Sequence, residues 1–362
     1  MTASIPHALG AREYTDPAVF ETEKHKIFFR TWQFAVHSSC LPEPGAYQTF
    51  DICDQALFCV RDHDGRIRTF HNVCMHRAHR LVEGSGIRKT LVCPYHAWSY
   101  NLDGRLKRAP NQHKVAGFEA SRICLTEIKT EVLLGFVFVN LDPQAAPMSS
   151  WYPNLEAELF SFVPEIDDLA PMTEVSVDEY CNWKVTVENY SECYHCRLNH
   201  RTFVEGVVDP DSYNVMPQGH CLRHTTRSAN LERLSYPIDP LANEYASAYS
   251  SWFLWPSFSF QVYPGNMLNT YHFQPQSVDR TRAVRGWFSP AGAHSSVVAQ
   301  LAEQDRATTV AEDVRLVESV QKGLNSLGYK PGPLILDVDN GVNSEHPIKA
   351  LYDWREQDLA RS

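Results

Sequence analysis

The spacing of apolar positions along this 362-residue chain changes at about residue 45. Before that point, residues 13–34 set apolar side chains among Glu, Lys and Arg at intervals typical of an amphipathic helix. After it, up to about residue 142, short apolar runs alternate with turn signals such as Asp64-Gly65 and Asp103-Gly104. Short runs between turns predict an all-β domain built of short strands.

A stretch rich in proline and serine, from Pro143 to Pro153, is the best linker candidate. Beyond it the pattern mixes helical and extended segments, so the second domain is predicted to be α+β. We expect helices at 153–162, from about Trp183 onward and at 295–327, and strands at 173–180, 252–263, 269–274 and 281–289.

Composition limits the classes of protein that the chain can be. Hydrophobic residues make up 43% and charged residues 21%, which is typical of a folded globular protein. The net charge is -10 and no dense basic run occurs, so nucleic acid is not an expected partner. The apolar run at 132–141 is shorter than the roughly 20 residues of a membrane helix, and the first residues lack signal-peptide features. We therefore expect no membrane association and a cytoplasmic protein.

Two short arms in the β domain each combine one cysteine with one histidine. The first arm carries Cys74 and His76, and the second, sixteen residues later, carries Cys93 and His96. In a Rieske centre, two Cys hold one iron of a two-iron, two-sulfur cluster and two His hold the other iron. A Cys2His2 zinc site uses the same residue types, but zinc fingers place the two Cys on one arm and the two His on the other. The mixed arms favour a Rieske [2Fe-2S] cluster.

A second set of metal-binding residue types lies in the segment that ends at His200. Glu192 and His195 are three positions apart and would share a helix face, whereas His195 and His200 would diverge by about 140 degrees on a regular helix. We therefore expect the helix to end or bulge between the two histidines. Two His and a distant carboxylate form the facial triad of non-heme Fe(II) oxygenases, which leaves coordination positions open for dioxygen and substrate.

The residues alone leave other interpretations of this segment open. Cys193 and Cys196 with the same two histidines would suit a zinc site, and the Cys-x-x-Cys spacing would suit a redox motif. The histidines would also fit ordinary surface or core positions. A Rieske protein that only carries electrons is a further hypothesis, but it needs no second domain. Because a Rieske cluster moves single electrons, an iron that accepts them in the same chain favours the facial triad.

The two motifs together resemble those of the Rieske non-heme iron oxygenases, over nearly the whole chain. The resemblance implies an α+β protein with three segments. Residues 1–44 would be an N-terminal helical segment that packs on the catalytic domain, and 45–148 an all-β Rieske domain. Residues 149–362 would be the catalytic domain for a mononuclear iron, with an antiparallel sheet covered by helices in a helix-grip-like fold.

In this family the third iron ligand is an aspartate in the long C-terminal helix. Glu312-Asp313, followed by VRLVESVQKG, resembles the stretch that carries it. Asp313 is therefore the expected third ligand beside His195 and His200. Glu312 and Asp305 are the weaker candidates.

An acidic residue three positions before the first iron-binding histidine connects, in this family, a cluster ligand of the neighbouring subunit to the iron site. Glu192 occupies that position, so the resemblance implies a homotrimer with an electron path from His76 or His96 of one chain through Glu192 of the next to His195. Most ring-hydroxylating members carry Asp there. Glu within a Glu-Cys-Tyr-His string is similar to the branch that acts on quaternary ammonium compounds such as glycine betaine, carnitine and stachydrine.

The resemblance thus implies the oxygenase component of a monooxygenase that uses O2. Electrons would come from NAD(P)H through a separate flavin and iron-sulfur reductase. The substrate would be a small N-methylated cation, hydroxylated or N-demethylated with release of formaldehyde; the alternative is a ring-hydroxylating enzyme for an aromatic acid.

A permanent cation is held by aromatic faces. The candidates on the aromatic strands are Trp252, Trp255, Phe260, Tyr263 and Tyr271. An equally simple interpretation places most of these side chains in the core.

Overall fold

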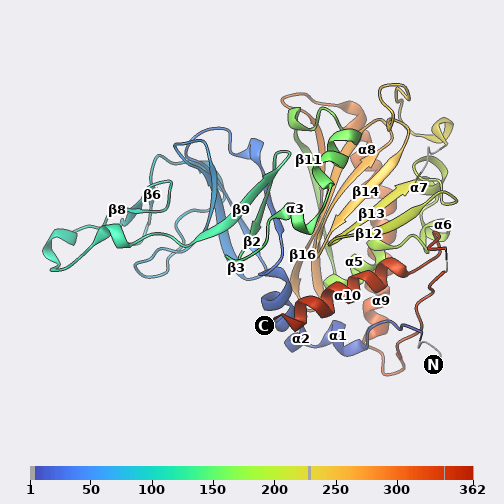
Figure 1. Cartoon of the computed structure of the whole chain (residues 1–362), viewed down its shortest axis with the longest axis horizontal. Helices are drawn as coiled ribbons and strands as arrows, with labels where there is room; N and C mark the ends of the chain where they lie inside the picture. Colours follow the sequence, from blue (N-terminus) through green and yellow to red (C-terminus); the bar gives the residue numbers. More distant parts are fainter. Residues whose placement is uncertain (1–4, 227–229, 338, 362) are drawn as a thin grey trace. The chain divides into compact units, whose positions relative to one another are not determined.

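The structure is a computed structural model of the chain and describes residues 5–226, 230–337 and 339–361. The chain divides into two compact units, one formed by Phe28–Ala145 and one by the residues up to Ile27 together with those from Ala146 onward (Figure 1). Within the described ranges, no helix has both the length and the apolar character needed to cross a membrane.

The unit of Phe28–Ala145 is built of short antiparallel strands, which confirms the all-β prediction for this region. Seven strands form one sheet in the order β1-β10-β9-β4-β3-β2-β5, and three form a small sheet in the order β6-β7-β8. Their bounds are β1 (Gln33–His37), β2 (Ala46–Ile52), β3 (Gln55–Arg61), β4 (Ile67–His71), β5 (Ser85–Ile87), β6 (Leu91–Val92), β7 (Ser99–Tyr100), β8 (Leu106–Arg108), β9 (Glu127–Leu133) and β10 (Phe136–Asn140).

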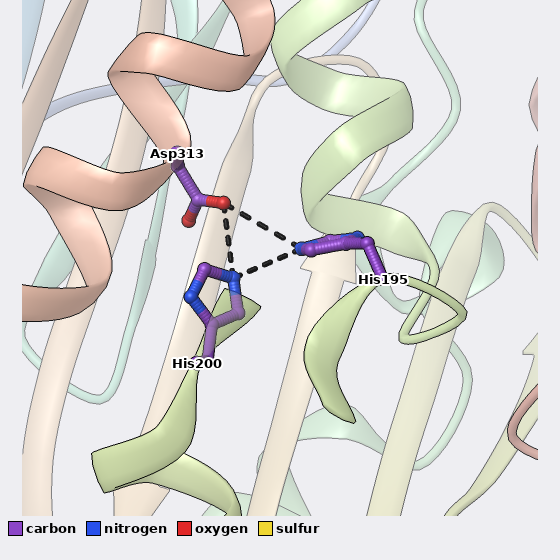
Figure 2. A group of neighbouring side chains, drawn as sticks. All are labelled: His195, His200 and Asp313. Atoms are coloured by element: carbon purple, nitrogen blue, oxygen red, sulfur yellow. Dashed lines mark hydrogen bonds and ion pairs between the residues drawn. The ribbon is translucent and has the colours of Figure 1, made fainter. Parts of the chain in front are cut away.

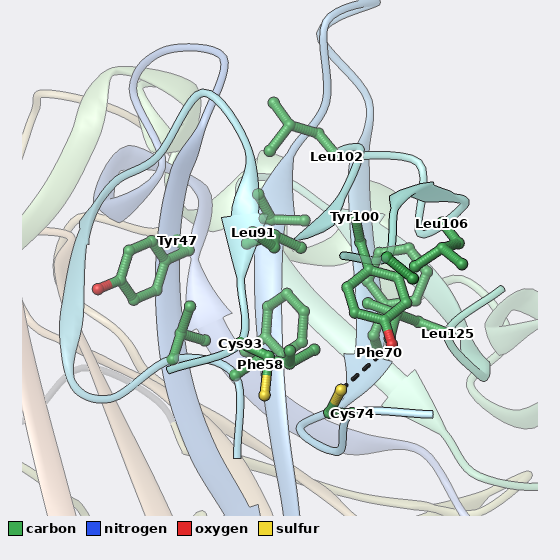
Figure 3. Close-up of a cluster of buried hydrophobic side chains, with 14 residues drawn as sticks. Tyr47, Phe58, Phe70, Cys74, Leu91, Cys93, Tyr100, Leu102, Leu106 and Leu125 are labelled. Atoms are coloured by element: carbon green, nitrogen blue, oxygen red, sulfur yellow. Dashed lines mark hydrogen bonds between the residues drawn. The ribbon is translucent and has the colours of Figure 1, made fainter. Parts of the chain in front are cut away.

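A hydrophobic cluster forms the core beneath the loops of this unit, as Figure 3 shows. Phe58, Phe70 and Tyr100 are fully buried in it. The side chains of Cys74 and Cys93 belong to the same cluster, and both are only 2% exposed. The core therefore places the two thiols together at its edge.

The helix expected over residues 13–34 is shorter and interrupted, which corrects that prediction. It consists of α1 (Ala11–Thr15), α2 (Pro17–Glu23) and a π-helical turn, η1 (Lys24–Phe28). The break falls at Asp16, whose carboxylate accepts the N–H of Ala18 at 2.8 Å and so caps α2, with Pro17 at its first position. The smaller unit begins at Phe28, so the expected segment 1–44 is divided between the two units.

The larger unit is built on a seven-stranded antiparallel sheet in the order β11-β17-β16-β15-β14-β13-β12. Its strands are β11 (Leu169–Glu179), β12 (Asn214–Gln218), β13 (Cys221–Thr226), β14 (Tyr249–Leu254), β15 (Phe258–Tyr263), β16 (Met267–Ser277) and β17 (Arg280–Pro290). The segment 252–263, expected as one strand, is a hairpin of β14 and β15, because Pro256 after Trp255 interrupts the ladder and turns the chain.

Helices precede, separate and follow the strands of this unit, as expected for an α+β domain. They are α3 (Met148–Trp151), α4 (Leu155–Phe162), α5 (Trp183–Ser191), α6 (Cys196–Asn199), α7 (Arg201–Gly206), α8 (Ser296–Asp305), α9 (Ala311–Leu324) and α10 (His346–Ala360). Helix α5 packs on β16 and β17, and α8 packs on β17 and β11 (Figure 1). The predicted helix at 295–327 is confirmed as α8 and α9 joined by a π-helical turn, η7 (Arg306–Val310).

Candidate metal centres and active site

The four predicted cluster ligands lie on two loops with the same backbone course. In each loop the cysteine carbonyl accepts the N–H four residues later at 3.0 Å, from Ala78 to Cys74 and from Ala97 to Cys93. Ala78 and Ala97 have φ values of 57° and 56°, a left-handed conformation that residues with a side chain seldom adopt. The repeated turn directs the side chains of both arms toward one place.

Burial separates the thiols from the imidazoles of this site. Cys74 and Cys93 lie inside the core, whereas His76 is exposed and His96 is half-buried. The two imidazoles meet edge to face, with ring centroids 4.6 Å apart, and His76 stacks on Trp98 at 4.7 Å. Two inner thiols and two outer imidazoles fit a cluster with one Cys-held and one His-held iron.

Tyr100 contacts the buried side of this site, where the cysteines lie. Its hydroxyl accepts the N–H of Met75 at 3.1 Å and lies 3.3 Å from Cys74 Sγ, the contact drawn in Figure 3. Because the oxygen already accepts a hydrogen bond, its own hydrogen is available to a Cys74 thiolate.

The second predicted site comes together from three segments of the larger unit. His195 Nε2 and His200 Nε2 are 2.9 Å apart, and Asp313 Oδ1 lies 3.5 Å from the first and 3.1 Å from the second, as Figure 2 shows. Among the residues that the structure describes, His195, His200 and Asp313 form the one group of three or more possible ligands whose donor atoms lie close enough together to hold one ion. Asp313 Oδ1 is buried without a hydrogen bond of good geometry, which suits an oxygen that binds a metal.

Charges in this site are strongly coupled. Burial lowers the pKa of His195, but the carboxylates of Asp313 and Glu192 raise it to about 10. Burial likewise lowers the pKa of His200, and Asp313 raises it above its ordinary value. Burial raises the pKa of Asp313, yet the two imidazoles lower it overall. The carboxylate thus attracts positive charge to this point, which a divalent metal ion would supply.

Glu192 lies outside helix α5, which ends at Ser191, and its backbone is extended at φ -119° and ψ 162°. This corrects the expectation that Glu192 and His195 share a helix face. The Glu192 carboxylate accepts the backbone N–H groups of Tyr194 and His195, so it stabilises a new turn instead of continuing α5. The irregularity expected at Arg197, Leu198 and Asn199 lies elsewhere: α5 ends before His195, these three residues belong to the short helix α6, and the backbone leaves the helical course again at His200.

Each imidazole is also held from its outer side by a carboxylate. Glu192 Oε1 lies 2.5 Å from His195 Nδ1, and Glu312 Oε2 lies 2.9 Å from His200 Nδ1. Such carboxylates orient metal-binding imidazoles. Glu312 therefore supports His200, and Asp305 lies elsewhere, 3.0 Å from Arg285.

Cys193 and Cys196 form a disulfide. Their sulfurs are bonded to each other, so the structure does not contain the zinc site considered above, which needed both thiolates. The disulfide is the oxidised form of a Cys-x-x-Cys pair and lies in the turn that carries His195.

A cavity opens beside His195, His200 and Asp313, and six aromatic side chains belong to its walls. Its aromatic lining residues are Tyr190, Phe203, Tyr213, Tyr249, Tyr263 and Tyr271. The strands contribute alternate residues, such as Gln261 and Tyr263 of β15, because successive side chains of a strand point to opposite faces.

Only two of the five predicted aromatic residues, Tyr263 and Tyr271, line this cavity. Trp252, Trp255 and Phe260 do not. Trp252 and Phe260 occupy the alternate positions of β14 and β15 and therefore point to the opposite face of the sheet. All three are buried in the core, where the indoles of Trp252 and Trp255 donate to the carboxylates of Glu158 and Asp358.

Sequence reasoning missed several lining residues, namely Tyr190, Phe203, Tyr213, Tyr249, Gln261 and Arg285. Arg285 could have been found from the sequence. It is two positions before Trp287 on the same strand, so both side chains point to the same face, and a charged residue on a buried face needs a charged or polar partner. The residues on α5 and α7 carried no comparable signal.

Glu192 and His195 also belong to the wall of a second cavity, of about 320 Å³. Its other lining residues come mainly from α5, α9 and α10. Glu192 is thus accessible both from the aromatic cavity and from this second one.

Comparison with protein families matches residues 31–119 to the Rieske [2Fe-2S] domain and residues 166–360 to the ring hydroxylating alpha subunit (catalytic domain). The second match covers more than half of the chain. The two matched regions fall on the two compact units.

Individual relatives cover almost the full chain. The carnitine monooxygenase oxygenase subunit of Escherichia coli (strain K12) is 34% identical over 96% of this chain and 92% of its own length. Choline monooxygenase of Beta vulgaris is 27% identical over 92% of this chain and 74% of its own. The structure of the quaternary ammonium Rieske monooxygenase CntA with L-carnitine superposes with a TM-score of 0.87, at 30% identity, over 98% of this chain and 96% of that one.

Proposed function

The chain belongs to the Rieske non-heme iron oxygenases as an oxygenase subunit, and we propose that its substrate is a small quaternary ammonium compound of the betaine type. Its cofactors are a Rieske [2Fe-2S] cluster and a mononuclear iron, and O2 and NAD(P)H are the co-substrate and electron source typical of the family. The substrate proposal is supported by the cavity lining and by the names of the relatives.

We assign the cluster to Cys74, His76, Cys93 and His96, and the mononuclear iron to His195, His200 and Asp313. When bound, the cluster supplies single electrons and the iron activates dioxygen. Glu192 and Glu312 orient the two iron-binding imidazoles through their Nδ1 atoms.

The aromatic wall is the observation that carries the substrate class. Six aromatic side chains line the cavity, which also contains the carboxylate of Glu192. A quaternary ammonium group cannot donate a hydrogen bond, so it is held by the faces of aromatic rings and by nearby negative charge. Tyr263 and Tyr271 remain candidates for these contacts.

We further propose that an N-methyl group lies next to the iron site and is hydroxylated. Dioxygen, two electrons and two protons then yield the hydroxymethyl group and water. The N-hydroxymethyl product breaks its C–N bond to give formaldehyde, the demethylated amine and a proton.

The electron path is proposed to run between subunits of a homotrimer, with a separate NAD(P)H-dependent reductase as the donor. Met75 and Tyr95 beside the cluster ligands are 37% and 52% exposed, which suits a surface that contacts a second copy. Glu192 in the wall of the second cavity would receive the neighbouring cluster ligand, His76 or His96.

A substrate screen tests the proposal. The purified trimer, a suitable reductase, NADH and O2 are combined with a set of betaines, quaternary ammonium alcohols and aromatic acids. We expect oxygen uptake and formaldehyde release in step with the loss of a betaine. If oxygen uptake is instead coupled to the conversion of an aromatic acid, and to no quaternary ammonium compound, the substrate proposal is wrong and ring hydroxylation takes its place.

A further inference from the structure

A row of polar side chains crosses the sheet beneath the aromatic cavity. His224, Ser251 and Gln261 lie directly opposite one another on β13, β14 and β15. Arg285 of β17 reaches the same row, because its Nη2 donates to Gln261 Oε1 at 2.6 Å. All four residues line the cavity, and their exposed fractions are 1%, 1%, 4% and 4% in that order.

Two groups of this row have atoms without a protein partner. His224 Nε2 is buried and forms no hydrogen bond with the residues that the structure describes. Arg285 directs Nε toward Asp305 Oδ2 at 3.0 Å and uses Nη2 for Gln261 and Tyr263. Within the described ranges its Nη1 has no hydrogen-bond acceptor. Buried polar atoms without partners are costly, so their position in a cavity wall points to a polar group of the ligand.

Arg285 is held as a rigid cation. Its guanidinium carbon lies 5.0 Å from the ring centre of Tyr271 and 5.9 Å from that of Tyr263. Burial opposes the charge, but Asp305 and the surrounding tyrosines keep the pKa of Arg285 above its ordinary value. A guanidinium fixed in this way offers a directed N–H to a carboxylate and offers no attraction to a second cation.

The cavity therefore contains two kinds of charge. Glu192 is acidic and lies beside the predicted iron site, whereas Arg285 is basic and belongs to the sheet. The bound iron would offset the charge of Asp313, so Glu192 and the aromatic faces are the groups that attract a cation there. A zwitterion is complementary to both regions, with its ammonium group toward Glu192 and the tyrosines and its anionic group toward Arg285.

We infer that Arg285 binds the carboxylate of a zwitterionic substrate and orients its N-methyl groups toward His195, His200 and Asp313. This inference rests on the proposed function and narrows it. The enzyme then prefers quaternary ammonium carboxylates to quaternary ammonium alcohols or esters of the same length. Ser251 and His224 supply further polar contacts along the row.

The test compares a trimethylammonium carboxylate with its own methyl ester, which keeps the cation and removes the negative charge. Dissociation constants are measured by calorimetry on the complete trimer, and kcat and KM are measured with reductase, NADH and O2. A charge-assisted hydrogen bond corresponds to about a 10- to 100-fold difference in affinity. We expect the wild-type protein to bind the carboxylate more tightly than the ester by a factor in this range.

Removing Arg285 alone leaves Asp305 buried without its partner, so the informative variant is Arg285→Gln combined with Asp305→Asn. We expect this double variant to lose the preference through weaker binding of the carboxylate, with ester binding changed by less than about threefold. Arg282→Gln is the matched control, since Arg282 lies on the same strand, is 45% exposed and pairs with Asp178. It should behave as the wild-type protein does. Arg285→Lys keeps the charge and should retain part of the preference.

The outcomes separate the two proposals. If the wild-type protein converts no quaternary ammonium compound, the proposed function itself is wrong. If it converts them but the double variant weakens the carboxylate and the ester equally, or weakens neither, the Arg285 assignment is wrong. If the protein binds an aromatic acid through Arg285 and binds no betaine, the inference that the substrate is a zwitterion is wrong.

Discussion

Glu192 Oε1 lies 2.5 Å from Nδ1 of His195. The residue proposed to pass electrons between subunits therefore also contacts an imidazole that we assign to the iron. The two roles respond differently to substitution. Orientation needs one acceptor oxygen for the Nδ1 hydrogen, whereas the proposed electron path needs the second carboxylate oxygen to accept the N–H of a neighbouring cluster imidazole, and Gln offers an NH2 group there.

Glu192→Gln is predicted to keep the iron and lose turnover. The Gln carbonyl still accepts from His195 Nδ1, so iron content should stay near the wild-type value. Glu192→Ala removes the acceptor, and iron affinity should fall by about 10- to 100-fold. Iron is measured by mass spectrometry, and electron transfer is measured as the reoxidation rate of the reduced cluster in the presence of O2. Normal reoxidation in Glu192→Ala would contradict the proposed path.

Asp313→Ala is predicted to remove the mononuclear iron and leave the cluster. Iron should fall from about three to about two atoms per chain, with the visible absorbance of the cluster unchanged. Glu312→Ala is the matched comparison, since Glu312 contacts only the outer nitrogen of His200. It should retain more iron than Asp313→Ala. The opposite order would exchange the roles of the two acidic residues.

Mixed trimers test the path between subunits. A Cys93→Ala chain lacks the cluster and an Asp313→Ala chain lacks the mononuclear iron, so each homotrimer should be inactive. After equal random mixing, three quarters of the trimers contain both chains, and each of these has one productive neighbouring pair, which gives about a quarter of wild-type activity. A path within one chain would leave every mixture inactive.

Tyr100→Phe is predicted to lower the reduction potential of the cluster. The hydroxyl lies 3.3 Å from Cys74 Sγ, and a hydrogen bond to a ligand sulfur stabilises the reduced, more negative state. The shift should be on the order of tens of mV, measured by a spectroscopic redox titration. Tyr47→Phe is the control, because Tyr47 belongs to the same core but donates to the carbonyl of Glu83. Equal potentials for both variants and the wild type would show that the Tyr100 contact has no effect.

Asp358→Asn is predicted to stabilise the protein more at pH 8 than at pH 5. Burial raises the pKa of Asp358 to about 6, although Trp255 and Arg361 favour the charged form. The folded pKa exceeds the unfolded value of about 4, so the stability linked to this group is present at low pH and is lost as pH rises through 6. The gain from the substitution should be about 1 kcal/mol larger at pH 8 than at pH 5, measured by urea unfolding. A gain independent of pH would show that Asp358 titrates as an exposed carboxyl does.

The motifs that could be predicted from the sequence are the local ones. Cys74, His76, Cys93 and His96 lie within 23 residues, on two loops of one compact unit. Asp313 is more than one hundred residues from His200, so its place beside the histidines depends on how α9 packs against α5. Family resemblance suggested it, and no spacing in the chain would have done so.

The aromatic lining residues were hard to assign for a different reason. Every residue of β14 and β15 is buried, because both faces of the sheet are covered. Alternation of apolar and polar residues disappears in such strands. The sequence therefore did not reveal whether Trp252 and Phe260 or Ser251 and Gln261 face the cavity.

The active site has two walls of different construction. The proposed metal-binding residues and their supporting carboxylates come from helices and the turns between them, whereas Ser251, Gln261 and Arg285 come from the sheet. A strand can change one side chain on one face and leave its backbone and its other face in place. Substitutions on the sheet can thus change which molecule the cavity accepts without displacing the groups proposed to hold the iron.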